Sequence, residues 1–136
     1  MENCIFCKIV QGEIPAAKVY EDDETFAFLD IGPTNPGHTL VIPKSHATDI
    51  YNMSDESIAS TFKMVKRIAS AVKVATGASG INVHMNNEKT AGQVVFHAHV
   101  HVIPRFENDG LVHWGHRSTY KTGEDEALAE KIRNFL

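Results

Sequence analysis

The sequence predicts one α+β domain in which an antiparallel sheet packs against a single long helix. Segments that alternate like strands lie before and after one long amphipathic stretch, and short turns could join most of them. The chain has 136 residues, 43% of them hydrophobic, which suits one domain with its own core. No repeat, low-complexity tract or Pro/Gly-rich linker divides residues 1–136, so we expect a single domain.

Spacing and turn residues mark the elements of the first half. Apolar residues at helical spacing predict a short helix over residues 5–10. Two adjacent aspartates then separate the strand-like segments 18–21 and 25–30, which predicts a hairpin. The apolar run at residues 38–42 predicts a buried strand, and the proline that follows closes it.

The long helix opens the second half. Ser54 suits an N-cap and Gly77 suits the opposite end, so residues 54–76 are predicted to be helical. The apolar stripe of this helix comprises Ile58, Phe62, Val65, Ile68, Ala69 and Val72. Strands are predicted at 80–85 and 94–103, and a short helix at 124–136.

Charge and hydropathy exclude two classes of partner. Thirteen Lys and Arg against 17 Asp and Glu give a net charge of −4, which argues against non-specific binding of nucleic acid. No apolar run approaches the roughly 20 residues that span a bilayer. The first residues lack the basic and apolar regions of a secretory signal, so we expect a cytoplasmic protein.

Eight histidines are the most informative feature of the composition, and three of them alternate in one tract. In a strand, His97, His99 and His101 would share one face while the residues between them face a core. Neighbouring histidines would then lie about 6.6 Å apart, so all three could not easily hold one metal ion. A row of imidazoles better suits binding of a phosphate chain, with one imidazole as nucleophile.

Two other interpretations of the tract stay open. It could be a solvated strand face with an accidental run of histidines, or half of a metal site shared by two neighbours. The clean alternation with small and β-branched residues makes us favour phosphate chemistry over both.

Cys4 and Cys7, the only cysteines, form a CxxC motif near the predicted first helix. The pair could be a redox couple, half of a tetrahedral zinc site, or two small buried apolar residues. A thioredoxin-like pair would need a preceding strand in a βαβ unit, which this sequence does not predict. We favour zinc.

The chain resembles the histidine triad (HIT) family, and its Hint-like branch in particular. The tract from His97 to Ile103 matches the signature His-φ-His-φ-His-φ-φ, where φ is apolar. Other matching segments lie in the same order and spacing: Ile5-Phe6, Glu13-Ile14-Pro15, Glu21-Asp22, Phe28-Leu29-Asp30-Ile31, Gly37 to Lys44, and Gly92-Gln93. The resemblance covers residues 4–105, leaves a tail at 106–136, and implies a HIT-like fold that forms a two-fold dimer.

The resemblance also implies roles for the site residues. His99 matches the nucleophile that attacks the α-phosphorus of a nucleotide, with its other ring nitrogen donating to a backbone carbonyl. His101 and His38 match phosphate-contacting histidines, and His97 is the first histidine of the catalytic triad. The remaining matches are Asp30 for the ribose hydroxyls, Asn86 and Gln93 for the phosphate and leaving group, and Ile5, Phe6, Ile9, Phe28 and Ile31 for the purine. For the apolar set, plain core packing is an equal alternative.

A structural zinc follows from a wider resemblance. Some members of the superfamily, including galactose-1-phosphate uridylyltransferase, pair a CxxC with two distant histidines. The matching positions here are His46 and His97, so the implied ligands of one zinc per chain are Cys4, Cys7, His46 and His97. No catalytic metal is implied.

The sequence departs from the Hint-like pattern at Val94, where many members have a serine that assists the leaving group. Valine cannot donate a proton, which puts the preference for amine leaving groups in question. The tail also departs, although Trp114 matches a region that reaches the partner's site in Hint-like dimers. We interpret His84, His113 and His116 as structural or surface residues.

Together these features predict a purine nucleotide hydrolase or transferase that acts through a covalent nucleotidyl-His99 intermediate. The alternatives are a diadenosine-polyphosphate hydrolase, or a zinc-containing nucleotide- or protein-binding module with little activity. We expect a homodimer centred on the long helix and on the strand near residues 80–86, since pairing two sheets protects exposed edges.

Overall fold

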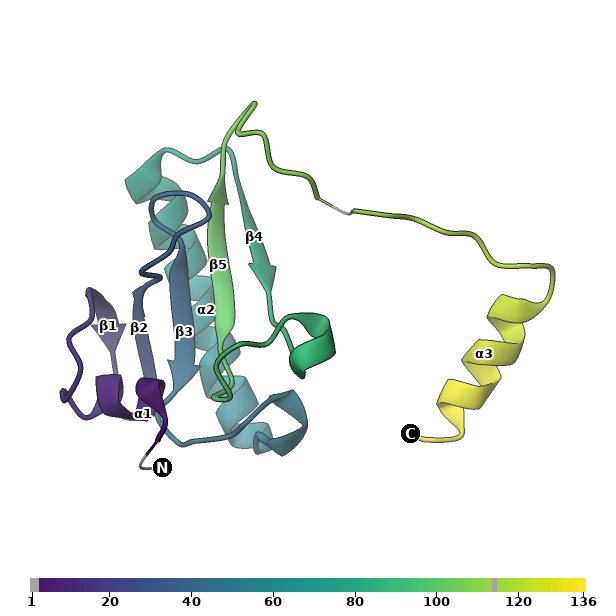
Figure 1. Ribbon diagram of the computed structural model, residues 1–136, viewed down its shortest axis with the longest axis horizontal. Coiled ribbons are helices and arrows are strands. Elements are labelled where there is room, and N and C mark those ends of the chain that lie inside the picture. Colours follow the sequence, from purple (N-terminus) through teal and green to yellow (C-terminus); the bar gives the residue numbers. More distant parts are fainter. Residues whose placement is uncertain (1–2, 114) are drawn as a thin grey trace.

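The computed structural model describes residues 3–113 and 115–136 and contains a five-stranded antiparallel sheet in the order β1-β2-β3-β5-β4 (Figure 1). The strands are β1 Lys18–Glu21, β2 Thr25–Leu29, β3 Thr39–Pro43, β4 Gly80–His84 and β5 Val100–Arg105. The helices are α1 Ile5–Val10, α2 Asp55–Thr76 and α3 Glu124–Arg133, with 3₁₀ turns at Ile50–Asn52 and Lys89–Ala91. The predicted α+β class is confirmed.

The hairpin of β1 and β2 is fixed by the side chain of Asp22. One carboxylate oxygen of Asp22 accepts hydrogen bonds from the backbone N–H of Glu24 at 2.9 Å and of Thr25 at 2.7 Å. The hydroxyl of Thr25 donates to the same oxygen at 2.9 Å. An aspartate that satisfies backbone donors two and three residues on favours a tight turn, so the predicted hairpin forms.

Helix α2 begins and ends where the sequence predicts. The Ser54 hydroxyl caps its first turn by accepting from Ser57 N–H, and Gly77 ends it with a φ of 70°. The predicted stripe is wrong at Phe62, which is 39% exposed, while Thr61 and Met64 are buried. The stripe that faces the sheet is therefore centred on residues 61, 64, 65, 68 and 72.

The sheet has an α2 face and an α1 face. Val41, Val100 and Val102 pack against α2 in one core cluster. Phe28 and Leu40 point the other way and pack with α1 in a second cluster. Figure 1 shows the sheet between α2 and α1. Because side chains alternate along β5, the residue between its two buried valines faces the α1 side.

The predicted strand 94–103 is wrong at its beginning, because β5 begins only at Val100. Ahead of it, Ala98 N–H donates at 2.7 Å to the carbonyl of Ala47, which lies in the loop after β3. This bond takes Ala98 out of the sheet ladder. His97 and His99 consequently lie on an irregular segment and do not share a strand face.

The C-terminal tail leaves the sheet after residue 105 (Figure 1). Helix α3 has no buried residue and lies away from the sheet, with Ile132 59% exposed. None of the helices within the described residues is long and apolar enough to cross a membrane.

Candidate active site

A cavity of about 990 Å³ opens on the α1 face of the sheet. Its apolar lining includes the five residues assigned to the purine: Ile5, Phe6, Ile9, Phe28 and Ile31. Its polar lining is Asp30, Asn86, His99 and His101. The cavity therefore combines an apolar slot with a few convergent polar groups, which is typical of a site for a nucleotide-sized ligand.

His99 presents an unprotonated nitrogen to this cavity. Its Nδ1 lies 2.7 Å from the carbonyl oxygen of His97. A carbonyl can only accept, so Nδ1 carries the proton and Nε2 keeps its lone pair. Burial lowers the pKa of His99, which keeps the imidazole neutral. The expected bond to a backbone carbonyl is present.

His38 and His101 are hydrogen-bonded to each other, and His101 carries its proton on the opposite ring nitrogen from His99. Thr34 N–H donates to His38 Nδ1 at 3.1 Å, so a neutral His38 has its proton on Nε2. His38 Nε2 lies 2.9 Å from His101 Nδ1 and donates to it. His101 therefore carries its proton on Nε2. Burial lowers the pKa of His101 to about 4, with His99 and other nearby histidines adding to the effect.

Asp30 lies directly after β2 and leaves one carboxylate oxygen free for a ligand. Its Oδ1 accepts from Gly32 N–H at 2.8 Å, which holds the turn after the strand. Its Oδ2 lies 3.6 Å from His38 Nε2. The half-buried carboxylate thus lies at the junction of the apolar slot and the histidines, where it could accept from hydroxyl groups.

Four thiol and imidazole groups converge beside the cavity. His97 Nδ1 lies 3.4 Å from Cys4 Sγ, 3.6 Å from Cys7 Sγ and 3.2 Å from His46 Nδ1. Cys7 Sγ lies 3.4 Å from His46 Nδ1. Tetrahedral zinc, with bonds of about 2.3 Å to sulfur and about 2.0 Å to nitrogen, separates sulfur and nitrogen ligands by about 3.5 Å. The cluster has these dimensions.

His97 belongs to this cluster of possible zinc ligands. Its prediction as a catalytic histidine beside His99 and His101 is therefore corrected. Its Nε2 lies 2.8 Å from the carbonyl oxygen of Pro43, so Nε2 carries the proton and Nδ1 is a free ligand atom. The ring is completely buried. The irregular backbone before β5 turns this ring away from the cavity, whereas a regular strand would have directed it toward His99.

A model of the HIT domain matches residues 11–108. The chain belongs to the HIT domain family. The names of two relatives state an enzymatic activity. The HIT protein is 48% identical to adenosine 5′-monophosphoramidase hnt1 of Schizosaccharomyces pombe, with 98% of each chain covered. It is 43% identical to adenylylsulfatase HINT3 of Arabidopsis thaliana, over 80% of this chain and 55% of that one.

Solved structures agree with the fold. SMU.412c from Streptococcus mutans superposes with a TM-score of 0.94 at 46% identity and covers 99% of this chain and 86% of its own. A zinc-bound histidine triad family protein from Mycobacterium smegmatis has a TM-score of 0.78 at 37% identity, covering 98% and 96%.

Gln93 lies outside the cavity of the HIT protein. Its Nε2 donates to the carbonyls of Thr48 at 2.6 Å and Val95 at 3.1 Å. Its Oε1 accepts from Glu88 N–H at 2.7 Å. With every polar atom used and the side chain buried, Gln93 holds the loop around Asn86 and does not itself face the substrate.

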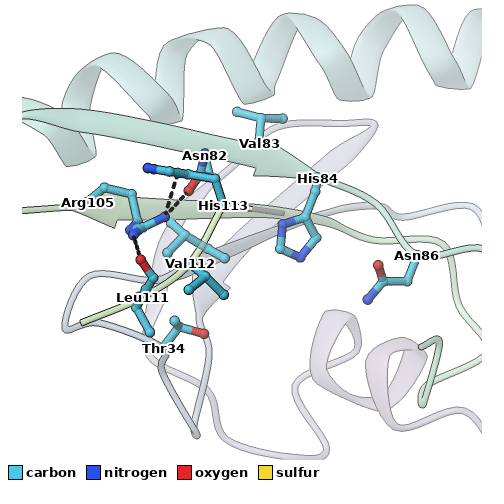
Figure 2. Close-up of a pocket in the computed structure, with 10 residues that line it drawn as sticks. Thr34, Asn82, Val83, His84, Asn86, Arg105, Leu111, Val112 and His113 are labelled. Carbon is cyan, nitrogen blue, oxygen red and sulfur yellow. Dashed lines mark hydrogen bonds between the residues drawn. The ribbon is translucent and has the colours of Figure 1, made fainter. Parts of the chain in front are cut away.

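His84 is the site residue that sequence analysis missed. It pairs across the sheet with His101, and the two ring centroids are 4.7 Å apart. His84 lines a neighbouring cavity of about 690 Å³ together with Asn82, Arg105 and His113. Figure 2 shows how these side chains lie. The sequence signal for His84 was the alternation of polar residues along 82–86. Only the register between β4 and β5 shows that this residue lies beside His101.

Four more residues were singled out from the sequence: His113, His116, Trp114 and Val94. His113 Nδ1 lies 3.5 Å from an Arg105 nitrogen, and His116 is exposed. Trp114, predicted to reach a partner's site, lies outside the described residues. Val94 lines the mouth of the cavity with 83% of its surface exposed.

Proposed function

We propose that this HIT protein is a nucleotide hydrolase or transferase that acts on the α-phosphate of purine nucleoside monophosphate derivatives. The substrates would be phosphoramidates or related compounds in which a leaving group X is attached to AMP or GMP. The observation that carries this proposal is the free Nε2 of His99, in the same cavity as Asp30 and the apolar slot. The phosphoramidase activity named for the relative of similar length supports it.

The proposed reaction has two displacements. His99 Nε2 attacks the α-phosphorus, a phosphorus–nitrogen bond forms, and the bond to X breaks with its electron pair leaving on X. Water then attacks the same phosphorus, releases His99 and gives its proton to solvent or a neighbouring base. Two in-line displacements leave the configuration at phosphorus unchanged overall.

His101 and His38 would stabilise charge on the phosphate during both steps. The Nε2–H of His101 is available because its Nδ1 accepts from His38. A donor that is already oriented before the reaction needs no reorganisation when negative charge develops on the phosphoryl oxygens. Asp30 would accept from the ribose hydroxyls and the slot would hold the purine, which together orient the α-phosphorus toward His99.

A side-by-side rate measurement tests the activity. We expect turnover of adenosine phosphoramidate and of its guanosine analogue with release of the nucleoside monophosphate. Faster turnover of diadenosine polyphosphates would favour the diadenosine-polyphosphate hydrolase. Tight nucleotide binding without turnover of any of these compounds would refute the enzyme and favour the binding module.

We also propose one structural zinc per chain, held by Cys4, Cys7, His46 and His97. The distances among these ligands support it, and so does the zinc-bound relative. The bound ion would join α1 to the loop after β3 and to the segment before β5. Two cysteines that form no disulfide also suit a reducing compartment such as the cytoplasm. Metal analysis of protein purified without added zinc should return one zinc per chain, and zinc-free protein would refute the site.

A two-fold homodimer completes the proposal. Strand β4 lies at an edge of the sheet and exposes Val83, and α2 exposes Phe62. Leu128 and Ile132 on α3 and Phe135 just after it are exposed apolar side chains. A second copy of this chain could cover the exposed edge and the tail at once.

A further inference from the structure

His97 makes two contacts that belong to different sites. Its side chain contributes Nδ1 to the cluster with Cys4, Cys7 and His46. Its backbone carbonyl accepts the Nδ1 proton of His99 at 2.7 Å. One residue therefore joins the cluster that fits zinc to the group that fits a nucleophile.

The link between these two contacts is stiff. The His97 ring is fixed at its far nitrogen by the carbonyl of Pro43, at 2.8 Å. The next residue, Ala98, is fixed through its N–H to Ala47, beside the ligand His46. A buried ring held at both nitrogens and followed by an anchored amide leaves its own carbonyl little freedom to turn.

Phe6 gives the same link a second support. Its ring packs edge-on against His97 with centroids 5.9 Å apart, and against His99 with centroids 5.2 Å apart. Phe6 stands between Cys4 and Cys7 in the sequence, so ligands on both sides of it hold it in place. Loosening the cysteines would therefore disturb the packing around both imidazoles.

We propose that His97 is a positioning residue that couples the zinc cluster to the nucleophile. Anchored through Nδ1, His97 holds its carbonyl where it accepts from His99 Nδ1–H and so keeps the lone pair on His99 Nε2. An imidazole without that acceptor can carry its proton on either nitrogen, and the Nε2–H form cannot attack. This inference rests on the proposed zinc site and the proposed hydrolase. It assigns the ion a role in catalysis in addition to stabilising the fold.

The matched pair His46→Ala and His46→Cys tests the coupling, because His46 is a ligand that does not line the cavity. His46→Ala removes one ligand, while His46→Cys restores four ligands in a Cys₃His set that zinc accepts. For His46→Ala we expect loss of zinc, a His99 proton shared between both ring nitrogens, and a fall in kcat of about 10- to 100-fold. His46→Cys should restore zinc, the single tautomer and most of kcat.

The readouts are zinc content, nitrogen-15 NMR of the His99 ring, and kcat measured separately from KM. Ile9→Ala is the control, since Ile9 lies on α1 and lines the cavity but is not one of the four proposed zinc ligands. It should raise KM and leave the proton of His99 on Nδ1.

Three results would overturn the coupling, and they differ in what else they affect. If zinc-free His46→Ala melts at a lower temperature but keeps the wild-type tautomer and kcat, zinc stabilises the fold without positioning His99. If wild-type protein holds no zinc, both the zinc site and the coupling fail while the hydrolase stands. If zinc and the tautomer are as expected but wild-type protein turns over no nucleotide, the hydrolase proposal itself is wrong.

Discussion

At the scale of single residues, the site depends on where each imidazole carries its proton. His99 and His101 are two residues apart, yet backbone and side-chain partners give them opposite tautomers. The carbonyl of His97 accepts the Nδ1 proton of His99, which leaves a lone pair on His99 Nε2. His38 donates to Nδ1 of His101, which leaves the Nε2–H of His101 as a donor. Attack and charge stabilisation are thereby assigned to different residues before any substrate binds.

Val94 is the residue at which we expect substrate preference to be adjustable. Adding a hydroxyl by Val94→Ser places a proton donor at the cavity mouth, so turnover of adenosine phosphoramidate should rise about tenfold, a modest share of what general acids contribute. Adenylyl sulfate should respond little, because sulfate leaves without a proton. Paired rate measurements on the two substrates check this.

The control for that change is Val94→Ala, which removes bulk without supplying a donor. If alanine raises phosphoramidate turnover as much as serine does, access to the cavity and not proton donation explains the effect.

At the scale of elements, the turn into β3 packs closely against the end of α2. Gly37 has a φ of 102°, and a Cβ there would lie 2.6 Å from Thr76 Cγ2 at the end of α2. Gly37→Ala should therefore destabilise the protein by about 2–4 kcal/mol, from strained φ and overpacking together. Denaturant unfolding of the variant measures this.

Gly12 supplies the matched control, since its φ is 81° and a Cβ there would meet nothing within 4 Å. Gly12→Ala tests positive φ alone and should cost about 1 kcal/mol. Equal losses for the two variants would show that contact between the turn and α2 does not matter.

Local signals were predictable from sequence, and long-range ones were not. Ser54 and Gly77 mark the ends of α2 through bonds within a few residues, so its bounds were predicted correctly. The late start of β5 depends on the bond from Ala98 to Ala47, 51 positions earlier in the sequence. The contact of His84 with His101 depends on strand register, which a period-two pattern does not specify.

Family resemblance supplied what periodicity could not at the site. The apolar slot and Asp30 do line one cavity, and the four implied zinc ligands do converge. Gln93 matched a motif position but does not line the cavity. Its amide is hydrogen-bonded to three backbone groups, two from its own loop and one from Thr48 in the segment after β3.

At the scale of the whole molecule, the two edges of the sheet offer a direct test of the dimer. Val83 on the β4 edge is 44% exposed and Val19 on the β1 edge is 42% exposed. Val83→Glu should shift the protein from twice 15.0 kDa to a monomer, because a charge would be buried at the pairing edge. Val19→Glu should stay dimeric. Sedimentation at micromolar concentration measures both, and a wild-type monomer with full activity would refute the dimer.

Acid should weaken the fold through its buried histidines. The pKa of His101 is about 4 in the folded protein and 6.5 for a free histidine. Between these values the unfolded chain binds more protons, so the free energy of unfolding should fall as pH drops from 6.5 to 4. Urea unfolding at pH 7 and pH 5 should show this loss, and it should be smaller in His101→Gln. An identical loss in that variant would assign the effect to other groups.

The central claim is that His99 attacks phosphorus, and trapping the adduct tests it most directly. Wild-type protein mixed with adenosine phosphoramidate and quenched within one turnover should gain the mass of one adenylyl group, mapped by peptide analysis to His99. His99→Ala should gain none and lose turnover, yet bind AMP with nearly unchanged affinity, since a nucleophile acts mainly in the transition state. An adenylyl group on another residue, or wild-type-like turnover by His99→Ala, would contradict the mechanism.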